Sequence, residues 1–435
     1  MTGKLYIKKR TILEWLPLYI IAMPFFFSLL LEVLELPDVI KYTVDVAWFV
    51  LFLTMVLKKQ AEGEKKILPL ILLSLFFLLY TFIVYLVNFQ SPFYFLWGLR
   101  NNFRFYIAFF AFAYYLQDED AETVFKFMDV LFWVNIVLSF IQFFLLGYRQ
   151  DYLGGIFGVS KGCNAYSIIF LTIILTRSLL RFMNGDESTL LCLSKCAFAL
   201  VIAALAELKA FFLFFALILF VATLITSFSW KKFILILFGV VMMFIGVILL
   251  EVIFKQDGVF TLEKMLELIT QDSYSRKNDL GRLTAIKQLS NMILTNKTEQ
   301  WFGLGLGNCD TSSFAICNTS FYKQYSYLHY NWFSSAFLFL ETGYIGLGLY
   351  FAFFVFIFIF CWRRRRNGEG NLLYNQMGII MSLMCVILTF YNSSLRTEAA
   401  YMVYFVLALP FMKSAKETDD EDEETDENEL DAPVS

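Results

Sequence analysis

The stretch ILEWLPLYIIAMPFFFSLLLEVL at residues 12–34 decides the fold class of this chain. As an α-helix it is long enough to cross a hydrocarbon core of roughly 30 Å, and apolar runs of comparable length recur along the sequence. Of the 435 residues, 59% are hydrophobic and 19% are aromatic, which is more apolar surface than a soluble protein could bury. The sequence therefore predicts an all-α, polytopic membrane protein. A transmembrane β-barrel would need alternating segments of about ten residues, and the sequence has none.

The first apolar run is expected to be a membrane span rather than a cleaved signal peptide. It is too long for a signal core, and no small-residue cleavage site follows it. Together the apolar runs predict about twelve transmembrane helices. The predicted spans cover residues 12–34, 39–57, 67–87, 96–116, 124–147, 163–182, 190–206, 210–228, 233–254, 333–361, 372–391 and 395–413.

Lysine and arginine in the short loops set the predicted orientation, because such residues are retained on the cytoplasmic side. With the amino terminus inside, most of them become cytoplasmic, and so does the carboxyl terminus. The chain then divides into nine spans (1–254), a large extracytoplasmic loop (255–332), three spans (333–413) and a tail (414–435). The tail holds 11 of the 38 acidic residues, and without them the net charge of −3 becomes about +8. Such a run is typical of a solvated, disordered cytoplasmic tail, the alternative being a docking segment for a partner.

Several cations are predicted at the outer membrane boundary despite the positive-inside bias. They are Arg100, Arg104, Arg149, Lys161, Lys209 and Arg396. The planar fork of a guanidinium suits phosphate, so these residues, beside a large outer loop, favour a diphosphate-binding site. The alternative is that each side chain only extends to lipid headgroups. Lys209 stands out because it lies between two apolar runs, although the neighbouring Glu207 could simply neutralise it.

The loop also carries a candidate proton acceptor. His329 is the only histidine in the chain, and histidine is the residue type most often used as a proton acceptor, although a lone histidine is more often structural than catalytic. Glu341 and Glu398 are weaker candidates for this role, and Asp310 and Asp279 are weaker still.

A glycine run and two cysteines complete the loop. Gly303, Gly305 and Gly307 lack the ending of a nucleotide-binding loop, so we expect them to permit a tight turn or a close approach to a ligand. Cys309 and Cys317 lie in an oxidising compartment in the predicted topology, where a disulfide could form, and the sequence leaves that open. No group of histidines, cysteines and carboxylates has metal-ligand spacing, so we expect no metal.

Several short motifs follow one another along the loop and into the next span. In chain order they are Gly281-Arg282, the glycine run at 303–307, His329 with Asn331, and ETGYIGL at 341–347. In this order and spacing they resemble the O-antigen polymerase and O-antigen ligase family of bacterial envelope polysaccharide enzymes. The family often has adjacent histidine and asparagine, whereas Tyr330 separates them here. Lys209 stands where the family often has a basic residue.

The resemblance implies a membrane-embedded, metal-independent glycosyltransferase that uses no cofactor. Such an enzyme transfers a glycan from undecaprenyl diphosphate to a sugar hydroxyl on the outer side of the bacterial inner membrane. The implied catalytic residues are Lys209, Arg282 and His329. The implied diphosphate- and substrate-binding residues are Arg100, Arg104, Arg149, Lys161, Arg396, Gly303, Gly305, Gly307 and Asn331. Expected partners are the lipid-linked oligosaccharide, membrane lipids, and a flippase or chain-length regulator, but not nucleic acid.

Three functions remain open from the sequence. A polymerase would join the repeat units of an O-antigen or capsule, and a ligase would transfer the finished glycan to a lipid acceptor of lipopolysaccharide. We prefer the polymerase, because the weak match to the family pattern around His329 is typical of the more divergent polymerase branch of the family. A polysaccharide flippase or other transporter is the alternative from a different class. Carriers are commonly built from two repeated halves, and this sequence has no internal repeat.

Overall fold

The computed structural model describes residues 11–57, 64–227, 230–254, 279–312 and 314–413. Within these ranges the chain is helical, and its one β-type contact is an isolated bridge between Gln117 and Lys413. The first part of the predicted loop (255–278) and the predicted tail (414–435) lie outside the described residues.

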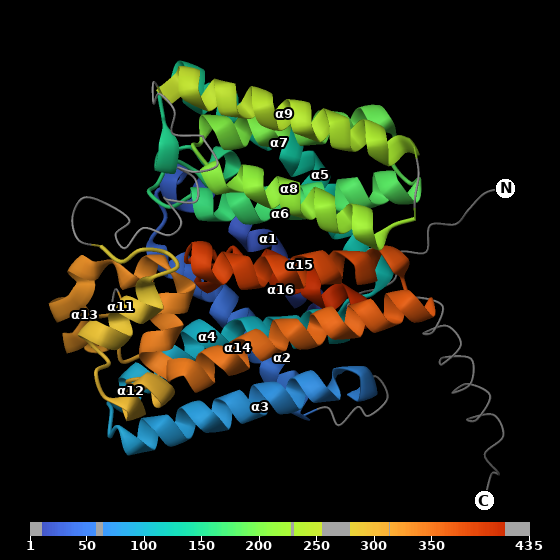
Figure 1. Cartoon of the computed structure of the whole chain (residues 1–435). Helices are drawn as coiled ribbons and strands as arrows, with labels where there is room; N and C mark the ends of the chain where they lie inside the picture. Colours follow the sequence, from blue (N-terminus) through green and yellow to red (C-terminus); the bar gives the residue numbers. More distant parts are fainter. Residues whose placement is uncertain (1–10, 58–63, 228–229, 255–278, 313, 414–435) are drawn as a thin grey trace, which may run out of the picture.

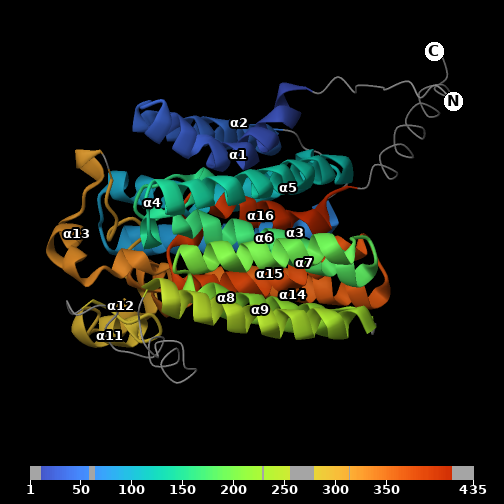
Figure 2. The same ribbon diagram turned by 90° about the horizontal axis from the view of Figure 1, so that it is seen from above.

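Long helices run nearly parallel to one another in both ribbon views, and three short helices gather at one end (Figures 1 and 2). The helices of the bundle are α1 (Ile12–Ser28), α2 (Thr43–Leu57), α3 (Glu64–Val87), α4 (Pro92–Tyr115), α5 (Asp118–Phe140), α6 (Asn164–Asn184), α7 (Thr189–Leu205), α8 (Lys209–Ile225), α9 (Trp230–Phe254), α14 (Ser334–Asn367), α15 (Leu372–Tyr391) and the shorter α16 (Ala400–Ala408). The short helices are α11 (Ala285–Met292), α12 (Lys297–Phe302) and α13 (Ser320–Tyr325).

The two ends of the bundle differ in what they carry. The loop end, as we call it, carries α11, α12 and α13, together with the connections that precede α2, α4, α14 and α16. The arginine end carries the four consecutive arginines at residues 363–366, which close α14. There Arg364 donates to the carbonyl of Pro410, and Arg365 donates to that of Ile225.

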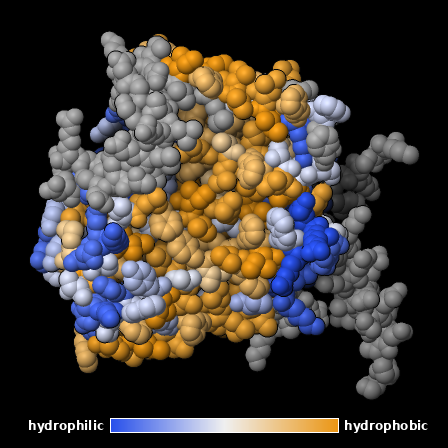
Figure 3. Space-filling model, in the orientation of Figure 1, coloured by the Kyte–Doolittle hydropathy of each residue, from blue (hydrophilic) through white to orange (hydrophobic). Residues whose placement is uncertain are grey.

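Seven helices in the described part are long and apolar enough to cross a membrane. Shorter apolar helices accompany them, at Thr189–Leu205, Lys209–Ile225, Leu235–Gly246 and Ala400–Phe411. An apolar surface covers the middle of the visible face, and hydrophilic residues lie toward the two ends (Figure 3). On α3, for example, Leu72, Phe76 and Leu79 are each more than half exposed, as expected for side chains that face lipid. The predicted class, a helical protein with several membrane-spanning helices, is confirmed.

The centre of the bundle is formed by α6, α15 and α16. In α16 the side chains of residues 401–408 are almost completely buried, and the helix contacts α4, α6 and α15. A charged network joins α5, α6 and α7 beside this core. In it Asp129 of α5 bridges Arg177 of α6 at 3.1 Å and Lys195 of α7 at 2.9 Å. The pairing offsets the cost of burying these cations between apolar helices.

The helix α14 is kinked near the loop end. Gly343 has φ 62° and ψ −166°, which is not helical. Because of the kink, the carbonyls of Leu340 and Glu341 lack the backbone donors that an unbroken helix would provide. Backbone N–H groups of the glycine run donate to these carbonyls instead. Leu304 N–H donates to Leu340 at 2.8 Å, and Gly305 N–H donates to Glu341 at 2.9 Å. A segment of the loop is thereby fixed against a transmembrane helix.

Candidate functional site

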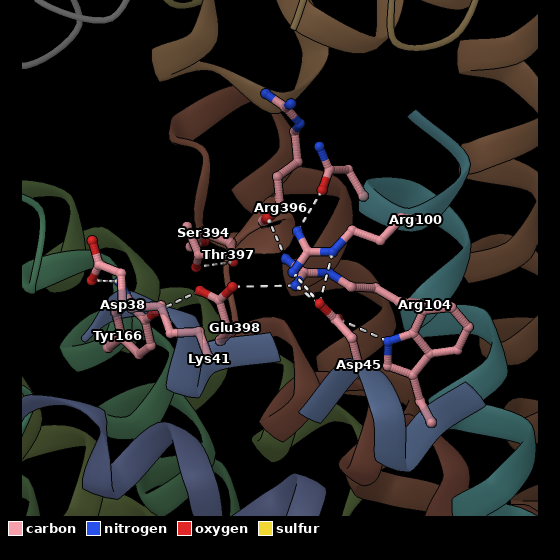
Figure 4. Close-up of polar contacts among 12 residues, drawn as sticks. Asp38, Lys41, Asp45, Arg100, Arg104, Tyr166, Ser394, Arg396, Thr397 and Glu398 are labelled. Carbon is pink, nitrogen blue, oxygen red and sulfur yellow. Dashed lines mark hydrogen bonds and ion pairs between the residues drawn. The ribbon is translucent and has the colours of Figure 1, made fainter. Parts of the chain in front are cut away.

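Three arginines and three carboxylates form a network at the loop end, and we call this group the arginine–carboxylate cluster. Figure 4 labels all of its members except Asp310. Its members are Arg100 and Arg104 of α4, Asp45 of α2, Asp310 of the loop, and Arg396 and Glu398 of the connection between α15 and α16. Four segments that are far apart in the sequence therefore contribute to it. Arg100 and Arg104 share one face of α4 because they are four residues apart.

Asp45 joins both arginines of α4. Its Oδ2 accepts from Arg100 Nη2 at 2.7 Å and from Arg100 Nε at 3.0 Å, and its Oδ1 lies 3.9 Å from Arg104 Nη1. Trp48 Nε1 also donates to Asp45 Oδ1, at 2.9 Å. Arg100 lies over the rings of Trp97 and Tyr42 as well, at 5.0 and 5.2 Å from their centroids. A carboxylate with this many donors is held in one orientation.

Arg104 is the most deeply buried cation of the cluster. Its side chain is 4% exposed, and its Nη1 donates to Glu398 Oε1 at 3.2 Å. Its Nη2 donates to the backbone carbonyl of Arg396 at 3.3 Å. Since a buried charge without a partner is costly, these contacts hold the connection between α15 and α16 against α4.

Glu398 is an ionised partner rather than a base. Burial alone raises its pKa, but Arg104 and a hydrogen bond from Tyr166 outweigh that effect and lower the pKa to about 2. The Tyr166 hydroxyl donates to Glu398 Oε2 at 2.9 Å. A carboxylate with so low a pKa accepts a proton poorly at neutral pH. Its role in this arrangement is to balance the charge of Arg104.

Arg396 faces the loop. Its Nη2 lies 3.7 Å from Asp310 Oδ2, and its guanidinium carbon lies 3.0 Å from the ring centroid of Phe337. Asn101 of α4 donates to the same oxygen of Asp310 at 2.6 Å. Burial lowers the pKa of Arg396, and Asp310 and Glu341 oppose that shift. The cluster is therefore continuous from α2 through α4 to the loop.

Glu341 lies at the inner edge of the cluster and is completely buried. Its Oε1 accepts the backbone N–H of Cys309 at 3.2 Å. Among the described residues, Oε2 has no hydrogen-bond partner. A buried carboxylate oxygen without a donor, close enough to Arg396 to interact electrostatically, is the strongest candidate here for a group that takes up a proton.

The structure brings together Arg100, Arg104 and Arg396 of the residues singled out by the sequence. Lys209 instead forms an ion pair with Glu207 at 3.0 Å, at the start of α8. Arg282 lies over the ring of Tyr391, the last residue of α15, at 4.4 Å from its centroid. Tyr391 directly precedes the connection that carries Arg396 and Glu398.

The remaining polar candidates lie elsewhere at the loop end. His329 has φ 52° and stacks on Trp332, with ring centroids 4.0 Å apart. Lys161 Nζ lies 5.9 Å from the centroid of the same Trp332 ring, and Asn331 lies in the short turn at Tyr330–Trp332. Arg149 lies over Phe143, at 3.9 Å. Among the described residues, no hydrogen bond or ion pair joins the side chains of His329, Lys161, Asn331 or Arg149 to the arginine–carboxylate cluster.

The glycine run serves packing in this structure. A Cβ at Gly303 would lie 2.5 Å from the Glu341 carbonyl, and one at Gly307 would lie 1.8 Å from the carbonyl of Tyr94. The backbone of the run is in contact with α14 and α4, so the close approach expected of these glycines is to the protein itself. Cys309 and Cys317, the two loop cysteines, are both free thiols.

The sequence reasoning missed Asp45 and Tyr166. Asp45 interrupts the second apolar run. A carboxylate at such a position indicates a cationic partner elsewhere in the chain, because an unpaired charge there would be costly. Tyr166 gave no signal, because a tyrosine at the start of an apolar helix is common at membrane interfaces. Asp310 and Glu398 were recognised only as lesser candidates, and both prove to be members of the cluster.

Comparison with known proteins assigns no family. No family model matches the chain, and no curated protein matches it.

Proposed function

We propose that this protein is a polymerase that joins undecaprenyl-diphosphate-linked oligosaccharide units of an O-antigen, capsule or related surface polysaccharide. In this proposal the chain crosses the bacterial inner membrane about twelve times, with both termini in the cytoplasm and the loop end outside. The observation that carries the proposal is the cluster itself, in which Arg100 and Arg104 share Asp45 and Arg396 pairs with Asp310 beside the loop. Three guanidinium groups at the level of the lipid headgroups suit a diphosphate.

The proposed reaction needs charge stabilisation more than a metal. A bond forms between the acceptor hydroxyl oxygen and C1 of the donor sugar, while the bond from C1 to the diphosphate oxygen breaks. The lipid diphosphate leaves with the electron pair, and the arginines of the cluster stabilise its charge. The hydroxyl proton passes to a carboxylate, for which Glu341 is the best placed, since Glu398 is held as an ion-pair partner.

Binding of the donor requires that the ion pairs rearrange. Arg100 and Arg396 are each partly exposed, at 18% and 13%, and both are paired with carboxylates. A bound diphosphate would replace Asp45 as the partner of Arg100 and Asp310 as the partner of Arg396. In this exchange each arginine keeps an anionic partner, while Asp45 and Asp310 keep the hydrogen bonds from Trp48 and Asn101.

Single substitutions in a strain whose own gene is deleted test this proposal. We expect Arg100→Ala, Arg104→Ala and Arg396→Ala each to reduce surface polymer by about 100-fold, the usual effect of losing one donor to a developing charge. Lys41→Ala is the matched control, because Lys41 is an exposed cation near the loop end that pairs with Asp38 and not with the cluster. Immunoblots of membrane fractions show whether each variant is present. Full polymer in all three arginine variants contradicts the proposal.

The glycan left by the deletion separates the competing functions. Surface glycan with a single repeat unit supports a polymerase, and polymer without its final acceptor supports a ligase. Lipid-linked units that remain on the cytoplasmic side support a transporter. One observation favours that last alternative, because arginines already paired with carboxylates between helices also suit a carrier that exchanges ion pairs during its cycle.

A further inference from the structure

A polar cavity lies at the arginine end, on the far side of the bundle from the cluster. Its volume is about 320 Å³, which is at the lower end of the range for small-molecule sites. It lies where α6 and α8 end, α14 ends and α15 begins. Its lining includes Asn184, Thr226, Ser227, Arg365, Arg366 and Gln376.

The backbone carbonyls around the cavity already have donors. The Ile225 carbonyl accepts from Arg365 Nε at 2.7 Å and from Gln376 Nε2 at 3.3 Å. Lys232 Nζ donates to the carbonyl of Thr226 at 2.8 Å. The contact through Nε fixes the plane of the Arg365 guanidinium and leaves its two terminal nitrogens for another acceptor.

The charge of the cavity is not balanced within the described part of the chain. Neither Arg365 nor Arg366 forms an ion pair with a described carboxylate. Lys232 adds a third cation nearby through its bond to Thr226. A concave site with this charge selects an anion, and phosphate is the anion that paired guanidinium groups bind best.

The surroundings of the cavity are apolar and exposed. Leu372, which lines it, is 49% exposed, and Trp362, one turn before Arg366, is 41% exposed. Arg365 lies 5.7 Å from the centroid of the Trp362 ring. A ligand with a phosphate and an apolar tail would satisfy both surfaces at once, whereas a free phosphate would leave the apolar side uncovered.

We propose that this cavity binds the phosphate headgroup of an anionic phospholipid. Arg365 and Arg366 bind the phosphate oxygens, and Asn184 and Ser227 lie where they can meet the polar part of the headgroup. Gln376 is buried and holds Asn184 in place by accepting from its Nδ2 at 2.7 Å. The acyl chains extend along the apolar surface that includes Leu372 and Trp362. The site lies at the opposite end from the arginine–carboxylate cluster and does not depend on the function proposed for it.

The test is the affinity of the purified full-length protein, in a neutral detergent, for fluorescent phosphatidylglycerol. We expect Arg366→Gln to weaken binding by about tenfold and Arg365→Gln/Arg366→Gln by more, since each removes a charge-assisted contact. Arg363→Gln is the matched control, because it removes the same charge from the same helix end, is exposed and does not line the cavity. It should change the affinity by less than about twofold.

Three results overturn the proposal. The first is an equal loss in Arg363→Gln and Arg366→Gln, which shows attraction to general charge. The second is unchanged affinity in the double variant. The third is displacement of the lipid by inorganic phosphate at the same concentration as unlabelled phosphatidylglycerol, which assigns the site to a soluble phosphate. Arg366 is exposed and forms no ion pair or hydrogen bond with another described side chain, so Arg366→Gln should fold, and its unfolding temperature without lipid checks this.

Discussion

At the scale of single residues, Arg104 joins several segments of the loop end. Its guanidinium contacts a carboxylate from α2, another from the connection before α16, and the backbone carbonyl of Arg396. Removing any one partner leaves a buried charge less well compensated, which usually costs more than the pair contributes. The residues around Arg104 are therefore interdependent. Among these partners, Glu398 is the one whose contribution to stability can be measured as a function of pH.

We expect Glu398→Gln to destabilise the protein at neutral pH and progressively less as the pH falls. The folded-state pKa of Glu398 is about 2, below the usual 4.5, so folding favours the ionised form. Its contribution is fully present above about pH 4.5 and is lost as the pH falls toward about 2. The full effect corresponds to about 3 kcal/mol. Thermal unfolding in detergent, compared for wild type and variant from about pH 7 to about pH 3, measures it.

Asp38→Asn is the control for that experiment, because Asp38 lies near the loop end and its side chain is 81% exposed. Its unfolding temperature should follow that of the wild type throughout. A difference between Glu398→Gln and wild type that stays constant or widens as the pH falls would show that Glu398 is not held as an ionised partner.

The sequence predicts part of the candidate site and misses the rest for physical reasons. Arginines near the predicted outer boundary are recognisable because they oppose the positive-inside bias, and Arg100, Arg104 and Arg396 do belong to one network. Lys209 shows the same signal, but the structure pairs it with Glu207. Spacing along the chain cannot distinguish these cases, because the partners of the cluster come from helices far apart in the sequence. Asp45 is an example.

At the scale of elements, the kink of α14 connects the membrane bundle to the loop. A run of apolar residues with glycines predicts a span but not a break in it, because single glycines are tolerated within helices. At Gly343 the break frees two carbonyls, and the chain at 303–305 takes them up. Glu341, just before the kink, is thereby turned toward Cys309 and the cluster.

We expect Gly343→Ala to lower stability by at least about 2 kcal/mol, because few residues other than glycine adopt this conformation. A Cβ at Gly343 would also lie 2.4 Å from the backbone of Trp301. Gly348→Ala is the matched control in the same helix, where a Cβ meets nothing within 4 Å. Unfolding of both variants in detergent measures the difference. Equal stability of the two variants would show that the kink is not fixed by the loop.

At the scale of the whole molecule, the length of the apolar runs is enough to predict the helical membrane class. The ends of the helices are harder to predict where charged residues interrupt an apolar run. Hydropathy places residues 395–399 within the last predicted span, yet α16 begins at Ala400. The preceding residues form a connection instead, because Arg396 and Glu398 pair with other segments there. Tertiary ion pairs decide that boundary, and a local pattern does not contain them.

The division of charge between the two ends leads to a prediction about orientation. Four consecutive arginines close α14, and such residues are retained in the cytoplasm, so the loop end should face outward. All seven cysteines are buried, which allows single cysteines to be introduced as reporters. Lys323→Cys in α13 should react with an impermeant maleimide in intact cells, because Lys323 is exposed at the loop end. Arg363→Cys should react only after the membrane is opened. The reverse pattern would place the arginine–carboxylate cluster on the cytoplasmic side, where no outer-leaflet polymerisation could use it.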